Sequence, residues 1–268
     1  MLNGLRAATF AARKRKMPEG ASSEAAAAEL HTLAVKAIER NETFYLLDSI
    51  LAGLARDCPG GAGPEPGKIH AVCSIDRGEG KSTISLALAT ALAHRGEGDV
   101  LLVEADLRSP TLAADLGRWD KPGLEDFLRQ RIPLENAIQQ TPVDRLRIVT
   151  ASASQPSAQK FPLRLTADEP AHLLGQPFLR QALEGLRSSY STIIIDLPAL
   201  SGGEAIPLID LLDGVVLVIK AGQTSKERME RAVSLIGREK LVGVVLNNVR
   251  HSAPWWLRRI LSEDGESA

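Results

Sequence analysis

Short apolar runs alternate with segments of helical periodicity through the middle of the chain. Runs bounded by turn residues predict strands at residues 68–72, 99–108, 145–150, 192–196, 213–219 and 241–247. Apolar residues at helical spacing predict helices at residues 84–92, 112–116, 123–128, 134–138, 173–186 and 226–235. Strands that alternate with helices indicate a parallel sheet with right-handed crossovers. The sequence therefore predicts an α/β fold, with a mostly parallel sheet flanked by helices.

The two ends of the chain do not follow this alternation. We expect a basic flexible tail, a helical extension, a linker rich in proline and glycine, the α/β domain and a tryptophan-containing tail, at residues 1–21, 22–58, 59–67, 68–250 and 251–268. Apolar residues between positions 44 and 54 repeat at helical spacing, so one face of the extension must pack against this domain or a neighbouring subunit. Trp255 and Trp256 would pack on the domain surface or dock on a membrane or a partner. The stretch 151–168, rich in Ser, Pro and Gln, predicts an exposed loop.

A glycine-containing loop follows the first predicted strand and leads into a predicted helix. Gly78 and Gly80 allow backbone N–H groups to face phosphate oxygens, and the positive end of the helix dipole favours an anion there. Lys81 is placed to reach the β- and γ-phosphates, and the Ser82 hydroxyl to bind Mg²⁺. The usual G-x-x-x-x-G-K-[ST] pattern has glycine where this chain has Ile75, so the Gly-Lys-Ser triplet alone would also fit a solvated turn. Strand, loop and helix together predict a P-loop NTPase, with the nucleotide-binding candidates Gly78, Glu79, Gly80, Lys81, Ser82 and Thr83.

Carboxylates stand at the ends of two further predicted strands. Glu104 and Asp106 close the second strand, and Asp196 closes the run that is richest in β-branched residues. A parallel sheet presents its ligand at the carboxyl ends of its strands, so these groups and the loop should converge on one nucleotide. Asp196 fits the position of a carboxylate that helps to hold Mg²⁺. A single aspartate at a strand end is more often a helix cap or a turn residue. The loop, the Glu104/Asp106 pair and Asp196 in this order along the chain nevertheless favour a nucleotide-binding site.

Composition and charge narrow the function classes. The chain has 268 residues, 44% hydrophobic and 24% charged, which is ordinary for a globular protein with one main domain. Its net charge of −1 gives no reason to expect nucleic-acid binding. The two cysteines, Cys58 and Cys73, form no disulfide framework, and no apolar run approaches the roughly 18 residues needed to span a bilayer. These features predict a cytoplasmic protein.

Three stretches of the domain stand in a characteristic order, at residues 78–83, 100–110 and 193–198. They resemble the bacterial tyrosine kinases (BY-kinases), which are cytoplasmic ATPase partners of polysaccharide chain-length proteins within the MinD/ParA-like P-loop superfamily. The resemblance covers residues 68–250 and implies ATP and Mg²⁺ as cofactors. It assigns catalytic roles to Lys81, Glu104, Asp106 and Asp196, metal binding to Ser82, Asp106 and Asp196, and nucleotide binding to the loop residues, Arg108 and Asn247, with Asn247 near the adenine.

The chain departs from the family pattern at several positions. The second stretch usually carries aspartate where this chain has Glu104, which moves the carboxylate by about one methylene. Arg77 stands where proline is common. The family's C-terminal tyrosine cluster is absent, since the only tyrosines are Tyr45 and Tyr190, and the N-terminal motif for ring assembly is missing after Glu42. The sequence therefore excludes autophosphorylation on a tail cluster and argues against ring assembly through that motif.

The first functional hypothesis is an ATP-binding BY-kinase-like protein of exopolysaccharide or capsule biosynthesis. By resemblance, its partner would be a membrane chain-length determinant, a polysaccharide co-polymerase, which would hold it at the inner face of the membrane. It would use Mg-ATP to phosphorylate protein tyrosine or to control that partner, and a homo-oligomer is compatible with it. The alternative is a MinD/ParA-type ATPase switch without protein phosphorylation, although that family usually has a lysine early in its loop, where this chain has Asp76.

Two further classes fit less well. A protein of the nitrogenase iron-protein type needs paired cysteine ligands for a cluster, and Cys58 and Cys73 are wrongly placed for that role. A small-molecule kinase needs a substrate lid, and we identify none in the sequence. The BY-kinase and the ATPase switch therefore remain the two hypotheses to compare with the structure.

Overall fold

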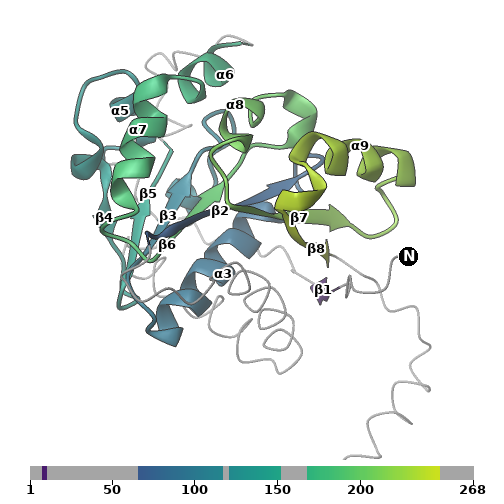
Figure 1. Cartoon of the computed structure of the whole chain (residues 1–268), viewed down its shortest axis with the longest axis horizontal. Helices are drawn as coiled ribbons and strands as arrows, with labels where there is room; N and C mark the ends of the chain where they lie inside the picture. Colours follow the sequence, from purple (N-terminus) through teal and green to yellow (C-terminus); the bar gives the residue numbers. More distant parts are fainter. Residues whose placement is uncertain (1–7, 11–65, 117–120, 152–167, 248–268) are drawn as a thin grey trace, which may run out of the picture.

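The computed structural model describes residues 8–10, 66–116, 121–151 and 168–247, and every structural statement below refers to these residues. Their central feature is a sheet of eight strands in the order β1-β8-β7-β2-β6-β3-β5-β4 (Figure 1). Neighbouring strands pair in parallel, except that β4 is antiparallel to β5. The strands are β1 Ala8–Phe10, β2 Lys68–Ser74, β3 Val100–Glu104, β4 Gln139–Gln140, β5 Leu146–Val149, β6 Thr192–Asp196, β7 Gly214–Lys220 and β8 Leu241–Asn247. The predicted α/β fold with a mostly parallel sheet is confirmed.

Helices cover both faces of the sheet (Figure 1). On one face lie α3 Lys81–Arg95 and the short α4 Leu112–Asp115. The other face carries α5 Leu124–Leu128, α6 Glu169–Leu174, α7 Pro177–Leu186, α8 Ile206–Ile209 and α9 Lys226–Ile236. Three short 3₁₀ helices lie in the connections, η1 Leu134–Ala137, η2 Leu200–Gly202 and η3 Arg238–Lys240. This is the layered architecture that alternating strands and helices predict.

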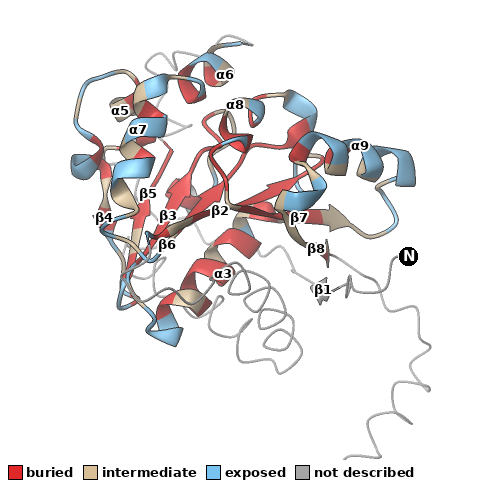
Figure 2. Ribbon diagram, in the orientation of Figure 1, coloured by how far each residue is buried: buried red, intermediate tan, exposed pale blue. Residues whose placement is uncertain are grey.

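The central strands are apolar on both faces because helices cover both faces. In β2, Ile69 and Ala71 face the layer formed by α5 to α9, while Val72 faces α3. In β6, Ile193 and Ile194 point to opposite layers in the same way. Figure 2 shows the inner strands almost wholly buried. Continuous apolar runs in the sequence therefore reflect a sheet that is buried on two sides.

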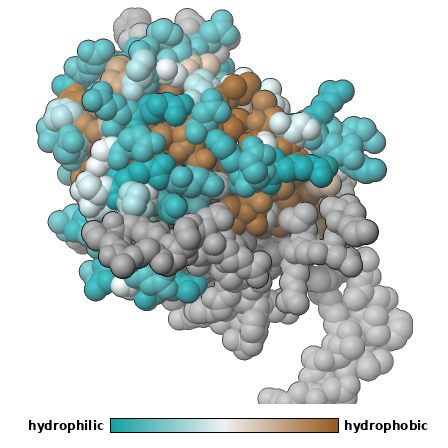
Figure 3. Space-filling view, viewed as in Figure 1, coloured by the Kyte–Doolittle hydropathy of each residue, from teal (hydrophilic) through white to brown (hydrophobic). Residues whose placement is uncertain are grey.

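The surface of the described domain is mainly polar. On the face seen in Figure 3, hydrophilic residues cover most of the surface and hydrophobic ones gather between α8 and α9. Two large apolar residues are exposed, Ile206 and Leu235. No helix in the described part of the chain combines the length and the apolar character needed to cross a membrane.

The predicted elements match the described ones closely, with one clear error. Each predicted strand is present, although the strand predicted over 99–108 ends at Glu104. The single helix predicted over 173–186 is wrong, because the chain forms α6 and α7 with a break between them. Pro177 has no N–H to continue α6, and it favours extended backbone at the residue before it, as found at Gln176 (φ −67°, ψ 132°). The two short edge strands, β1 and β4, were not predicted.

β1 lies within the segment expected to be a basic flexible tail. Its three residues pair in parallel with β8, from Ala8 opposite Val245 to Phe10 opposite Asn247. The rest of that tail, the helical extension at 22–58, most of the loop at 151–168 and the tryptophan-containing tail at 251–268 lie outside the described residues. The expectations for those segments therefore stay predictions.

Asp213 ties the start of β7 to the start of β2 and the end of α7. Its Oδ2 accepts hydrogen bonds from the Ile69 N–H (2.7 Å) and from Arg187 Nη1 (2.5 Å). Arg187 also donates to the Gly67 carbonyl oxygen at 2.8 Å. Burial alone would raise the pKa of the Asp213 carboxyl group, but the Arg187 guanidinium and the Ile69 N–H outweigh burial and hold that pKa below its usual value.

Replacing Asp213 by Asn is expected to lower the free energy of unfolding at pH 7 by about 2 kcal/mol, because hydrogen bonds to a charged group are lost. The folded-state pKa is depressed, so the stabilisation is complete above the ordinary aspartate pKa of about 3.9 and is lost as the pH falls through the folded-state value. Urea unfolding of wild type and Asp213→Asn at pH 7 and near pH 3 measures the difference. The exposed Asp210→Asn is the control, and an equal difference at both pH values would contradict the prediction.

Candidate nucleotide-binding site

The predicted site residues lie at the carboxyl ends of neighbouring parallel strands. β2 leads into the glycine-containing loop, and β6 and β3 end at Asp196 and Glu104, which are register partners. On the other side of β2, β7 ends at Lys220 and β8 ends at Asn247. The sheet topology therefore brings groups from five strands to one edge, as expected for a ligand site in an open α/β sheet.

The loop between β2 and α3 is held in a shape that only glycine adopts easily. Gly78 has φ +78° and Gly80 has φ +97°, both in the left-handed region. α3 begins at Lys81, and no side chain caps its N-terminus. The N–H groups of its first turn, which have no partners within the helix, are thus directed toward the loop, where an anion would find donors and the positive end of the dipole.

Lys81 is buried and paired with Asp106. Its Nζ lies 2.8 Å from Asp106 Oδ2, and both side chains are at most one-tenth exposed. Burial by itself lowers the pKa of the Lys81 ammonium group, but the charges of Asp196, Asp106 and Glu104 raise it above its usual value overall. Lys81 therefore carries its positive charge at neutral pH. Asp106 uses its other oxygen to accept a hydrogen bond from the Ser109 N–H at 3.0 Å.

Asp196 is fully buried and only half satisfied. Its Oδ1 accepts a hydrogen bond from Ser85 Oγ at 2.9 Å, while Oδ2 has no hydrogen-bond partner among the described residues. Burial raises the pKa of this carboxyl group, and the charge of Lys81 and the hydroxyl groups of Ser82 and Ser85 oppose the rise. An unpaired buried carboxylate oxygen is costly unless a ligand fills the gap.

A magnesium ion fits this arrangement. Three carboxylates, from Glu104, Asp106 and Asp196, surround the single ammonium group of Lys81, so the cluster has an excess of negative charge. Among the described residues, no group of three or more His, Cys, Asp or Glu side chains is placed to hold a metal alone. Mg²⁺ is commonly held by one or two protein oxygens together with phosphate and water, and the free Oδ2 of Asp196 is an oxygen of the right kind.

Glu104 has a different environment from the one that its family position implies. Its carboxylate accepts hydrogen bonds from four backbone N–H groups, those of Thr111 (2.6 Å), Leu112 (2.6 Å), Ala113 (3.3 Å) and Ala151 (3.0 Å). Burial raises the pKa of Glu104 to about 7; the Asp196 charge acts in the same direction, while the amide hydrogen bonds oppose it. The side chain thus joins the end of β3 to α4 and to the end of β5. Both of its oxygens already accept hydrogen bonds from the protein backbone.

Glu104→Gln is expected to lower the free energy of unfolding by about 3 kcal/mol, because an amide cannot accept four N–H donors and its own NH₂ group would face some of them. Guanidinium-induced unfolding measures the loss. Glu125→Gln, on a half-buried residue of α5, is the matched control. Equal stability of Glu104→Gln and wild type would show that the four amides are satisfied in another way.

Two residues assigned to nucleotide binding have protein partners in this structure. Arg108 Nε donates to Glu204 Oε1 at 2.5 Å. Asn247, expected near the adenine, donates from Nδ2 to the Glu79 carbonyl oxygen at 2.7 Å, so its amide contacts the loop backbone itself. The structure therefore places both residues beside the site, and their contact with a nucleotide stays a prediction.

Sequence reasoning missed the residues that support the site from a distance. Ser85 binds Asp196, Glu204 binds Arg108, and Thr224 and Arg228 contact the loop. Ser85 alone carried a local signal, since it stands one helical turn after Lys81. The other three are 96 to 152 positions away from their partners along the chain, so no local pattern identifies them.

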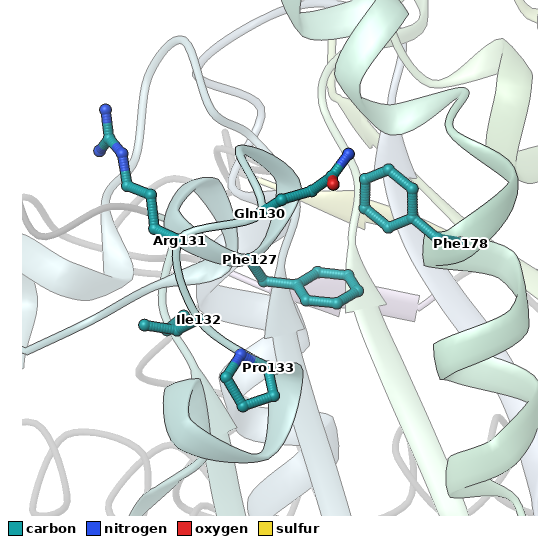
Figure 4. A pocket seen from close by; sticks show the side chains of 6 residues that line it. All are labelled: Phe127, Gln130, Arg131, Ile132, Pro133 and Phe178. Atoms are coloured by element: carbon teal, nitrogen blue, oxygen red, sulfur yellow. The ribbon is translucent and has the colours of Figure 1, made fainter.

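A pocket of about 430 Å³ lies between the α5–η1 connection and α7 (Figure 4). Two of its lining rings, Phe127 and Phe178, meet edge to face with centroids 5.4 Å apart. The other lining residues are Gln130, Arg131, Ile132 and Pro133. None of the predicted nucleotide-binding residues lines it, so this pocket is separate from the phosphate loop.

Comparison with known proteins agrees with the geometry. The family model of the CobQ/CobB/MinD/ParA nucleotide binding domain matches residues 70–254. Tyrosine-protein kinase YwqD of Bacillus subtilis is 31% identical over 184 residues, which are 68% of this chain and 72% of YwqD. The chain belongs to the bacterial tyrosine kinases. Tyrosine-protein kinase CpsD of Streptococcus agalactiae is 30% identical over 189 residues, which are 69% of this chain and 77% of CpsD.

Solved structures show the same fold. The kinase domain of VpsO superposes with a TM-score of 0.62 at 26% identity, covering 83% of this chain and 97% of that one. The kinase domain of Escherichia coli ETK gives a TM-score of 0.62 at 19% identity over 93% of this chain and 92% of its own, and shows the fold alone. The cell division ATPase MinD of Pyrococcus furiosus is a more distant fold relative, with a TM-score of 0.56 at 23% identity, covering 74% of this chain and 80% of its own. The chain is thus an ATP-dependent enzyme of the tyrosine-protein kinase type on a MinD-like P-loop fold.

Proposed function

We propose that this chain binds Mg-ATP at residues 78–83 and transfers the γ-phosphoryl group to a tyrosine of another protein. The observation that carries the proposal is the buried cluster beside the phosphate loop. There Lys81 is paired with Asp106, and Asp196 keeps one oxygen without a partner among the described residues. Membership of the bacterial tyrosine kinases supports tyrosine as the acceptor.

Each group has a separate role in the proposed reaction. N–H groups of the loop and of the first turn of α3 bind the phosphates. Lys81 leaves Asp106 for the β- and γ-phosphates, where its charge stabilises the transition state. Ser82 and Asp196 would hold Mg²⁺, which would neutralise phosphate charge. The tyrosine oxygen forms a bond to the γ-phosphorus as the bond from that phosphorus to ADP breaks, and Asp106, released from Lys81, accepts the hydroxyl proton.

Among the described residues, the chain offers no well-placed tyrosine acceptor of its own. Tyr190 is the only tyrosine among the described residues. It lies just before β6 begins at Thr192, and hence at the amino end of a strand whose carboxyl end forms the site. The residue is partly buried, and burial raises the pKa of its hydroxyl group. These features support an acceptor on a second protein.

The proposed partner is a membrane chain-length determinant of capsule or exopolysaccharide synthesis. The support for this partner is the BY-kinase resemblance of residues 68–250 and the family relationship. The chain would act in the cytoplasm, held at the inner face of the membrane by that partner. Phosphorylation of the partner, or ATP occupancy of the loop, would then control polymer assembly.

Phosphoryl transfer from labelled ATP tests this proposal. The purified chain is incubated with Mg²⁺ and the cytoplasmic part of the chain-length protein encoded nearest to it. Lys81→Ala removes the phosphate-binding ammonium group, and Lys226→Ala, which replaces an exposed lysine of α9, is the matched control. Circular dichroism of each variant shows whether it is folded.

Label on a partner tyrosine that Lys81→Ala abolishes and Lys226→Ala preserves would support the kinase. ATP binding and hydrolysis without transfer to protein would instead support the second candidate, an ATPase switch, which the MinD-like fold favours. Absence of Mg-ATP binding by the folded wild-type chain would overturn both.

A further inference from the structure

Glu79 lies inside the phosphate loop, yet its carboxylate is directed to the protein. The side chain is buried, with the residue only 4% exposed. Oε2 accepts a hydrogen bond from the Asp76 N–H at 2.9 Å, within the loop itself. Oε1 accepts a hydrogen bond from the N–H of Lys220, the last residue of β7, at 3.2 Å, and another from Thr224 Oγ1, in the connection between β7 and α9, at 3.0 Å.

The chemistry of this group excludes a direct role with phosphate. An ionised carboxylate is only an acceptor, and phosphate oxygens are acceptors too, so the two cannot hydrogen-bond. Both oxygens of Glu79 are already occupied by donors from the protein. Only the backbone of Glu79 is therefore available to a nucleotide, and the side chain must serve the loop.

Two further contacts tie the loop to neighbouring parts of the sheet edge. Arg228, in the first turn of α9, forms a paired ion contact with Asp76, at 2.6 and 2.7 Å. Asn247, at the end of β8, donates to the Glu79 carbonyl oxygen. The side chains of Arg228 and Asp76 are each about two-fifths exposed, so their ion pair stabilises the loop little compared with the buried Glu79 contacts.

We propose that the end of β7 and the β7–α9 connection, residues 220–225, form a positioning element for the phosphate loop, acting through the contact of Glu79 with Thr224 and the Lys220 N–H. Thr224 then sets nucleotide affinity without touching the nucleotide. The inference rests on the proposed Mg-ATP site and assigns roles to residues that neither the loop motif nor the strand-end carboxylates include.

The physical reason is conformational selection. The loop must keep Gly78 and Gly80 at positive φ for its N–H groups to face one anion. If the Glu79 carboxylate loses its distant donors, the loop populates other shapes, and the apparent affinity falls in proportion to the binding-competent fraction. The hydrophobic core does not include these residues, so the stability of the whole domain should change much less than the affinity.

Thr224→Val and Thr224→Ser on the full chain test the proposal. Valine keeps the shape of threonine and removes the donor, whereas serine keeps the donor. Titration calorimetry with a non-hydrolysable Mg-ATP analogue should show affinity about tenfold weaker for Thr224→Val, the effect of one lost hydrogen bond to a charged group. Thr224→Ser should stay within about twofold of wild type.

Amide hydrogen exchange of residues 73–83 without nucleotide gives the second readout. Faster exchange of this loop in Thr224→Val, with an unchanged melting temperature, supports positioning. A lower melting temperature with unchanged analogue affinity would overturn the inference and leave the Mg-ATP site intact. If folded wild type binds no analogue, the proposed function fails, and this inference fails with it.

Discussion

Asp196→Asn is expected to reduce Mg²⁺-dependent ATP turnover by about a hundredfold or more, with the chain still folded. Asp196 is fully buried and its Oδ2 has no partner among the described residues. Asn keeps an oxygen that can accept the hydrogen bond from Ser85, but it puts an NH₂ group or a neutral oxygen where the cation needs an anionic ligand. Loss of a few kcal/mol of transition-state charge stabilisation corresponds to this factor.

Turnover measured across a Mg²⁺ titration checks this prediction. Wild type should saturate with Mg²⁺, while Asp196→Asn should stay near the background rate at every concentration. Asp210→Asn changes an exposed carboxylate just after α8 and should behave like wild type. Wild-type turnover and Mg²⁺ dependence in Asp196→Asn would refute a metal role for this residue.

Gly80→Ala is expected to weaken nucleotide binding by about a hundredfold. Gly80 has φ +97°, and a Cβ there would lie 2.1 Å from Asn247 Nδ2. Left-handed backbone costs a residue with a Cβ roughly 1–2 kcal/mol. The contact adds to that cost because Asn247 is buried and would have to leave the Glu79 carbonyl oxygen. Backbone strain and lost contact together correspond to about two powers of ten in affinity.

Gly78→Ala is the matched control for this prediction. Gly78 also has positive φ, but nothing lies within 4 Å of a Cβ at that position. Gly78→Ala should therefore show the backbone cost alone, with affinity within about tenfold of wild type. Calorimetric titration with the Mg-ATP analogue compares the two variants. Equal losses in both would mean that the Asn247 contact is not part of the binding-competent loop.

The choice between a kinase and an ATPase switch depends on the acceptor more than on the nucleotide site. The loop, Lys81 and Asp196 would serve either function. Asp76, where the MinD/ParA type usually has lysine, is paired with Arg228 of its own chain. That pairing uses the start of the loop for an internal contact. The absence of a lysine at position 76 favours the kinase hypothesis, as the sequence relatives do.

Much of the fold was determined locally and could be predicted from the sequence. β6 and β8 have the predicted bounds because apolar, β-branched runs between turn residues suit a sheet buried on both faces. The phosphate loop was predictable for a similar reason, since Gly78 and Gly80 beside Lys81 combine backbone freedom with a cation. The positions of Asp106 and Asp196 followed from the rule that parallel strands end at one edge.

The tertiary structure decided which partner each polar group takes. Glu79 was grouped with the phosphate ligands, but its side chain finds donors 141 and 145 positions away. Glu104 was grouped with the catalytic carboxylates, but four backbone amides surround it. A local pattern predicts that a residue lies at the carboxyl end of its strand, and in a parallel sheet these ends meet at one edge. The hydrogen bonds that it makes there depend on segments distant in sequence, and only the packed chain brings those segments together.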